Sequence, residues 1–235
     1  QTAKEGMLQA ADGAEEIAGT LLQEDALRKM YAALAPIAAG TSVSDDLLRS
    51  TVKDLRATAL RLRTMAAYLA TTGPGTSNRT VLMNGLLDTA NGLEEIAGMY
   101  WLRDGISKTK NALTPIANGQ SVSTDTCRAT ADMLRASAPQ LRAAADALET
   151  TGAGTSNRPT LESGLRSAAN GLEEIAGLYW LRDGITKTKN ALTPIANRED
   201  VTTDTCRATV NMLDATAVDL RNAADLLVAT GPGTA

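Results

Sequence analysis

The stretch NGLEEIAGMYWLRDGISKTKNALTPIAN, residues 91–118, returns 79 residues later as NGLEEIAGLYWLRDGITKTKNALTPIAN, residues 170–197. A more divergent copy opens the chain: residues 13–19 read GAEEIAG, and both later copies have GLEEIAG at the equivalent positions. Self-similarity at a fixed spacing is the signature of a repeat protein. The sequence therefore predicts three tandem repeats with the bounds 1–79, 80–158 and 159–235.

Apolar residues within each repeat follow helical spacing, which predicts an all-α fold of about three helices per repeat. The second stripe lies out of phase with the first, so we expect a break near Gly98 or at Asn91, where Asn-x-x-Glu is typical of a capping box. A third helix should begin at Ser123 or Thr124 and run to about Glu149. The three stripes in the second repeat are Leu82, Leu86, Ala90, Leu93 and Ala97; Leu102, Ile106, Thr109, Leu113 and Ile116; and Cys127, Ala131, Leu134, Ala138, Leu141, Ala145 and Leu148.

Short linkers rich in Gly, Pro, Thr and Ser separate the repeats, because glycine ends helices and proline cannot continue them. They occupy residues 72–78, 151–157 and 230–234. Proline recurs near the end of the predicted second helix, as Pro36, Pro115 and Pro194, and should end or kink it there. Helical bundles joined by such short linkers predict an elongated rod.

The composition limits the classes of partner. Hydrophobic residues make up 43% of the 235 positions, but aromatic residues only 3%, so the cores must be thin and rich in Ala and Leu. A net charge of −4 gives no support for nucleic-acid binding, and the absence of a long apolar run predicts no membrane insertion. Cys127 and Cys206 occupy one repeat position, where the first repeat has Leu48, and are expected to be buried, inert thiols.

The sequence contains few residues suited to catalysis. It has no histidine and so lacks the most common general base and zinc ligand. Glu94 and Glu95 recur in every repeat, but neighbouring helical residues point about 100° apart and cannot share one proton. We expect a helix cap for the first and a solvated or ion-paired role for the second. The chain is predicted to be no enzyme and to have neither a metal site nor a cofactor.

The motif Tyr-Trp-Leu-Arg-Asp, present in the second and third repeats, holds both tryptophans of the chain. Tyr, Trp and Arg are enriched at interface hot spots, which makes the motif a candidate partner-binding patch. The alternative is that its aromatic residues complete the core, as the apolar pair Leu21-Leu22 would do in the first repeat. The candidate residues are Tyr100, Trp101, Arg103, Asp104, Tyr179, Trp180, Arg182 and Asp183.

These observations favour a structural repeat protein: a helical spacer, a surface component or a filament subunit, with a protein partner or self-association. Surface charge on the third helix changes from basic in the first repeat to acidic in the last. Drift on a solvated face explains this change, and the alternative is that unlike faces attract in a filament. One alternative is a multivalent linker that docks a common partner through the Tyr-Trp-Leu-Arg-Asp motifs. Another is a carrier of an apolar ligand or pigment.

Two features bear on the cellular compartment. The chain begins with Gln1, which indicates a processed protein, either secreted or organellar, or one cut from a longer array. Asn78-Arg79-Thr80 is an N-glycosylation sequon, and this makes Asn78 a candidate modification site if the protein is secreted. The sequence leaves the compartment open.

Overall fold

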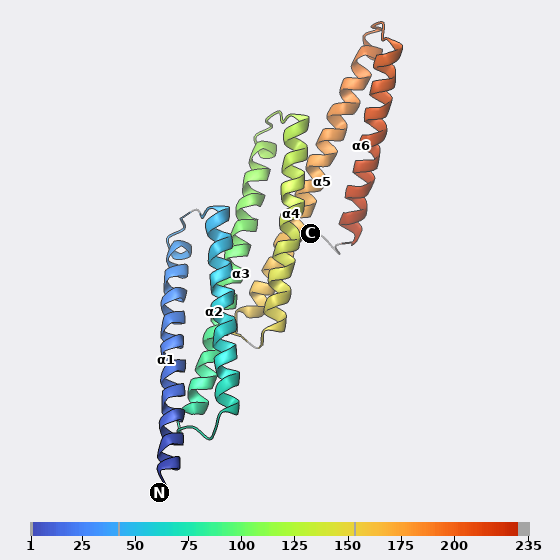
Figure 1. The fold of residues 1–235 in the computed structure, drawn as a ribbon. Helices are drawn as coiled ribbons and strands as arrows, with labels where there is room; N and C mark the ends of the chain where they lie inside the picture. The colour runs from blue at the N-terminus through green and yellow to red at the C-terminus, as the bar shows by residue number, and fades with distance from the viewer. Residues whose placement is uncertain (1, 42, 153, 230–235) are drawn as a thin grey trace. The chain divides into compact units, whose positions relative to one another are not determined.

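The computed structural model describes residues 2–41, 43–152 and 154–229, and every regular element in these ranges is an α-helix. The predicted all-α class is therefore confirmed (Figure 1). The helices are α1 (Ala3–Ala38), α2 (Asp45–Thr71), α3 (Arg79–Ala117), α4 (Thr124–Thr150), α5 (Arg158–Ala196) and α6 (Thr203–Ala229).

Each 79-residue period holds one long and one shorter helix, and the prediction of three helices per repeat was wrong. α3 and α5 each run unbroken for 39 residues, through Gly98 and through the Asn-x-x-Glu signal at Asn91. The phase of the stripe changes along α3 because the two halves of the helix pack in different surroundings. The first half lies in the core, whereas Ile106 in the second half is 57% exposed.

The ends of the helices follow their sequence signals. α1, α3 and α5 each end two residues after a proline. Ser123 begins α4 by accepting a hydrogen bond from the Thr126 N–H at 3.2 Å, as predicted. The linker 230–234 predicted after α6 lies outside the described residues.

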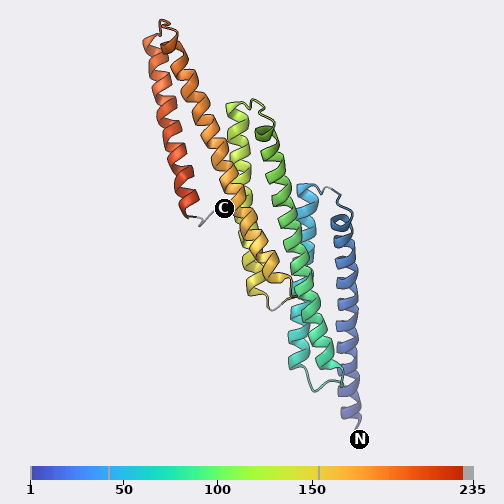
Figure 2. The same cartoon turned by 180° about the vertical axis from the view of Figure 1, so that it is seen from behind.

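Contacts divide the chain into two compact units, and each is described by itself. Unit 1 comprises Gln1–Leu102 with Ala143–Gly164, and unit 2 comprises Arg103–Arg142 with Leu165–Ala235. In unit 1, α1 and α2 form an antiparallel hairpin, and the first part of α3 runs beside it, as both views show (Figure 1 and Figure 2). Its core consists of Ala, Leu and a few larger side chains, with Leu55, Leu62, Leu86 and Leu93 at its centre.

The predicted stripe of α4 is buried along its whole length, from Cys127 to Leu148. The position of α6 that is equivalent to Cys127 is not buried in this way. Cys206 is exposed, which corrects the prediction of a buried thiol there. Cys127 is covered by neighbouring helices, and burial raises the pKa of its thiol, whereas no described helix follows α6 to cover Cys206.

None of the helices in the described ranges combines the length and the apolar composition needed to cross a membrane.

Candidate functional site at the repeat junctions

Arg79 and Arg158 are the first residues of α3 and α5, and they are the most deeply buried arginines described, at 4% and 2% exposure. Each follows a Thr-Ser-Asn sequence that ends a linker. A buried guanidinium must be paired and fully hydrogen-bonded to offset its loss of hydration. The surroundings of these two arginines therefore define how successive repeats are joined.

Arg79 binds three carboxylates of α1. Its Nη2 lies 3.1 Å from Asp12 Oδ1 and 3.1 Å from Glu15 Oε2, and its Nε lies 3.1 Å from Glu16 Oε1. Its Nη1 donates to the carbonyl of Leu69 at the end of α2. One side chain thus ties the start of α3 to both helices of the preceding hairpin.

The linker closes over the same carboxylates. The Thr76 N–H donates to Glu16 Oε1 at 2.8 Å, and the Thr76 hydroxyl donates to Glu16 Oε2 at 2.5 Å. The Thr72 hydroxyl donates to Glu15 at 2.7 Å. Hydrogen bonds from Thr76, together with Arg79, lower the pKa of Glu16, and those from Thr72 and Tyr68, together with Arg79, lower the pKa of Glu15.

Arg158 repeats this arrangement at the next linker with fewer charges. Its Nε lies 3.1 Å from Glu95 Oε1, and its Nη1 donates to the Leu148 carbonyl at 2.9 Å. Its Nη2 donates to the backbone carbonyl of Asn91, which stands where α1 has Asp12. The Thr155 N–H and hydroxyl each donate to Glu95 at 2.7 Å.

The cap predicted for Glu94 was wrong, whereas Glu95 is ion-paired with Arg158, which is one of the two roles predicted for it. Both glutamates are buried, at 7% and 8% exposure, in the middle of α3, so Glu94 caps no helix. It pairs with Arg63 of α2 at 3.2 Å, and Arg142 pairs in the same way with Glu173 at 2.6 Å. In α3, Glu94 thus holds the preceding shorter helix, while Glu95 holds the following linker.

Glycine makes room for the clamping arginines. Gly75 and Gly154 adopt φ values of +65° and +57°, a conformation that other residues rarely adopt. A Cβ at Gly75 would overlap the Arg79 side chain, and one at Gly154 would overlap that of Arg158. The shared Gly-x-x-x-Arg spacing in both linkers is the sequence signal for the clamp.

The tyrosines of the Tyr-Trp-Leu-Arg-Asp motifs lie inside the protein. Tyr100 and Tyr179 are each 2% exposed, and their hydroxyls donate at 2.7 Å to the carbonyls of Ala33 and Ala112. Burial raises the pKa of the Tyr179 phenol. Trp101 is half-buried against the unit 1 core.

The polar residues of the motifs also have partners within the chain. Asp183 is 1% exposed and pairs with Lys187 at 2.6 Å, and Asp104 pairs with Lys108 at the same distance. Arg182 donates to the Gln120 carbonyl. Trp180 is half-buried, with the Arg128 guanidinium 5.9 Å from the centre of its ring.

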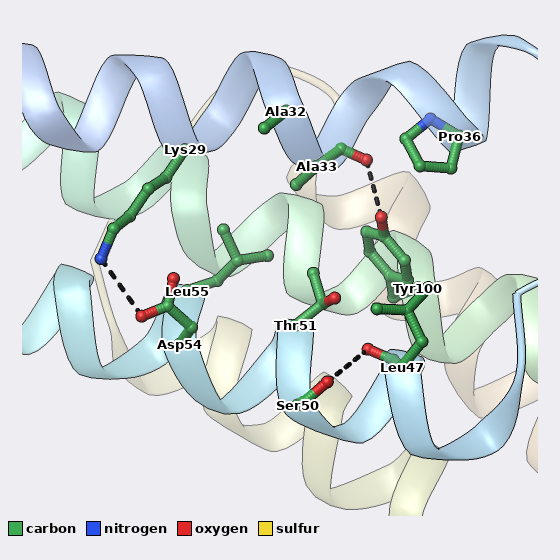
Figure 3. Close-up of a pocket in the computed structure, with 10 residues that line it drawn as sticks. All are labelled: Lys29, Ala32, Ala33, Pro36, Leu47, Ser50, Thr51, Asp54, Leu55 and Tyr100. Atoms are coloured by element: carbon green, nitrogen blue, oxygen red, sulfur yellow. Dashed lines mark hydrogen bonds and ion pairs between the residues drawn. The ribbon is translucent and has the colours of Figure 1, made fainter.

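A shallow groove lies in unit 1 beside Tyr100. Its volume is about 380 Å³, and Figure 3 shows Lys29 reaching across it to Asp54, 3.1 Å away. Figure 3 also shows the Tyr100 hydroxyl directed to the Ala33 carbonyl near Pro36. This groove does not test the carrier hypothesis, which stays a prediction.

The remaining candidates are placed as follows. Asn78 is exposed in the linker immediately before Arg79. Within the described residues, no group of three or more His, Cys, Asp or Glu side chains could hold a metal ion.

Comparison with protein-family models, with curated proteins and with solved structures finds no match to this chain.

Proposed function

We propose that the chain is a non-enzymatic structural protein in which three tandem helical repeats, 1–79, 80–158 and 159–235, form an elongated scaffold. The observation that carries this proposal is the recurrence of one buried arginine clamp at both linkers. Burying a guanidinium is costly unless every partner is in place. Using the same costly device twice makes sense if the function lies in the orientation of successive repeats.

The buried ionic residues also support a structural role. Glu16, Glu95, Arg79 and Arg158 are used in holding helices and linkers together. A catalytic acid or base must instead reach a substrate in a cleft. We infer that the chain acts as a spacer, a surface component or a filament subunit.

Small-angle X-ray scattering on dilute protein tests the proposal. An elongated scaffold gives a maximum dimension several times the cross-sectional diameter, whereas a compact sphere would overturn the proposal. Arg158→Met should broaden the pair-distance distribution because it loosens one junction. Arg28→Met, which removes an exposed arginine of α1 (side chain 76% exposed), is the matched control and should leave the distribution unchanged.

Multivalent binding through the Tyr-Trp-Leu-Arg-Asp motifs is the second candidate, because Trp101 and Trp180 keep part of their surface exposed. Replacing both tryptophans by Leu separates the two functions. Unchanged stability with loss of a partner supports binding, and loss of stability supports a packing role.

A further inference from the structure

One face of α6 is open where the equivalent faces of α2 and α4 are closed. Val52 of α2 is 4% exposed and Ala131 of α4 is 0% exposed, but Val210 at the same position of α6 is 56% exposed. Cys206 is exposed as well, and Leu220 is half-buried. An apolar stripe that is core in two repeats is thus left uncovered in the third.

The next long helix covers this stripe in the earlier repeats. In unit 1 the core joins α2 to five positions of α3 that are at most 2% exposed. In unit 2 the same five positions of α5 are also at most 2% exposed. These covering residues are Leu86, Ala90, Leu93, Ala97 and Tyr100 in α3 and Leu165, Ala169, Leu172, Ala176 and Tyr179 in α5.

The start of α1 presents the same five positions without a cover. Met7 is 72% exposed and Leu21 is 61% exposed, and the three alanines between them, at 11, 14 and 18, are exposed too. The chain therefore carries both halves of an interface that it closes twice internally. The uncovered face of α6 and the uncovered face of α1 have the residue types of the pair that packs at each junction.

Contacts between successive long helices fix the register of this pairing. A Cβ on Gly85 of α3 would meet Gln23 of α1 at 2.8 Å, and one on Gly164 of α5 would meet Leu102 of α3 at 3.4 Å. The next pair in this series is Leu181 with Gly6. Leu181 is 49% exposed beside an open groove of about 540 Å³ between α5 and Leu220 of α6, and Gly6 has open space around it.

We infer that the uncovered face of α5 and α6 binds the first half of α1 from a second copy of this chain, head to tail. This inference deepens the proposed structural function and rests on it. Because the two contacting surfaces differ, the contact is heterologous, and each bound copy presents a further free face. The product is an open chain of copies.

Charged positions both help and weaken this contact. Arg63 and Arg142 bind the carboxylates of the following long helix, and their equivalent, Arg221, is exposed and would face Glu15 of the second copy. Asp214 takes the position of Arg56, whose Nε lies 3.6 Å from Glu94, and would repel that same Glu15.

Sedimentation velocity over a range of protein concentrations tests the inference. The wild-type chain should form open-ended oligomers as concentration rises. Val210→Asp on the α6 face and Met7→Asp on the α1 face should each weaken association by about 30-fold or more, since each buries a charge in the apolar contact. The matched controls are Val218→Asp in α6 and Leu8→Asp in α1. Both alter exposed apolar residues that lie outside the two contacting stripes.

A mixture of the two blocked variants distinguishes head-to-tail contact from any symmetric one. Val210→Asp keeps an intact α1 face and Met7→Asp keeps an intact α6 face, so together they should form a 1:1 dimer and nothing larger. A mixture that stays monomeric, or wild-type protein that is monomeric at high concentration, would overturn the inference.

Asp214→Arg provides a gain of function, because it restores the residue found at both internal junctions. Association should tighten by about ten-fold and should weaken again in high salt. Scattering from the monomeric Val210→Asp variant tests the proposed function separately. If the Val210→Asp monomer is elongated but the wild-type chain does not associate, the head-to-tail inference is wrong and the proposed structural function still stands.

Discussion

The two junctions share one geometry but differ in charge. Arg79 meets three carboxylates, at Asp12, Glu15 and Glu16, whereas Arg158 meets one, at Glu95. Both arginines place Nε on the equivalent glutamate and Nη1 on the last turn of the preceding shorter helix. The invariant part of the clamp is thus the fork of the guanidinium, and the number of carboxylates around it can vary.

The difference arises from the partners of the first glutamate in each doublet. Glu94 is bound by Arg63 of α2, so it is drawn away from Arg158. Glu15, at the same position of α1, contacts Arg79 at 3.1 Å and accepts hydrogen bonds from Thr72 and Tyr68. The first junction therefore includes a carboxylate that the second junction leaves to another arginine.

Removing the arginines should give the largest effects and should separate the two junctions. Arg158→Met leaves Glu95 buried without its cation and should reduce the free energy of unfolding by about 3 kcal/mol. Arg79→Met should cost more, because three carboxylates then repel one another. Urea midpoints at pH 7, followed by circular dichroism, measure both. Equal losses would mean that the extra carboxylates at Arg79 carry no energetic weight.

Alanine at the linker glycines should affect both junctions alike. Gly75→Ala and Gly154→Ala combine a left-handed backbone with a Cβ that displaces the arginine, and each should cost about 2 kcal/mol. Gly40→Ala is the matched control, because Gly40 has φ of +65° and open space around it, and it should cost about 1 kcal/mol. If all three variants lose the same stability, displacement of the arginine is not part of the effect.

Acid should weaken the first junction. The pKa values of Glu15 and Glu16 are lowered in the folded chain from an ordinary value of about 4.5. The stabilisation is therefore complete above that pH and is lost as pH falls through the lowered folded-state values. Urea midpoints between pH 7 and pH 2.5 should fall less steeply for Glu16→Gln than for the wild type. An unchanged slope in this variant would remove Glu16 from the acid response.

Much of the fold could be predicted from the sequence, because its local signals are strong. The stripe from Cys127 to Leu148, the cap at Ser123 and the helix ends after Pro36, Pro115 and Pro194 all follow from short-range physics. The break predicted near Gly98 was wrong, because a change in stripe phase can mark a change of neighbours along one unbroken helix. The prediction that Cys206 is buried was wrong, because burial depends on which helix packs over a residue and not on the residue itself.

The clamp was missed although its signal was present. Thr-Ser-Asn-Arg ends both internal linkers, at 76–79 and 155–158, and a repeated arginine next to repeated glycines invites an explanation. The partners of Arg79 could not be deduced, since Asp12 lies 67 residues away along the chain. Local patterns identify a helix end, but only the packed hairpin shows which carboxylates meet it.

The smallest expected effect comes from exchanging one charge between the junctions. Asn91→Asp gives Arg158 the carboxylate that Asp12 gives Arg79 and also keeps an acceptor for Arg63, whose Nη2 lies 3.2 Å from Asn91 Oδ1. At pH 7 this should stabilise the chain by about 0.5 kcal/mol, as for a partly exposed pair. The reverse change, Asp12→Asn, should cost a similar amount.

The changes in unfolding free energy caused by these two substitutions should both be smaller in 1 M NaCl. Screening weakens the added or deleted ion pair but leaves the backbone hydrogen bonds of the clamp intact. A pair of urea titrations at low and high salt measures this. If Asn91→Asp instead destabilises the chain at both salt concentrations, desolvation of the new carboxylate exceeds its attraction to the two arginines. The cost of desolvation would then explain why an uncharged residue, Asn91, stands at this position of the second junction. The buried site around Arg158 would tolerate one carboxylate but not two.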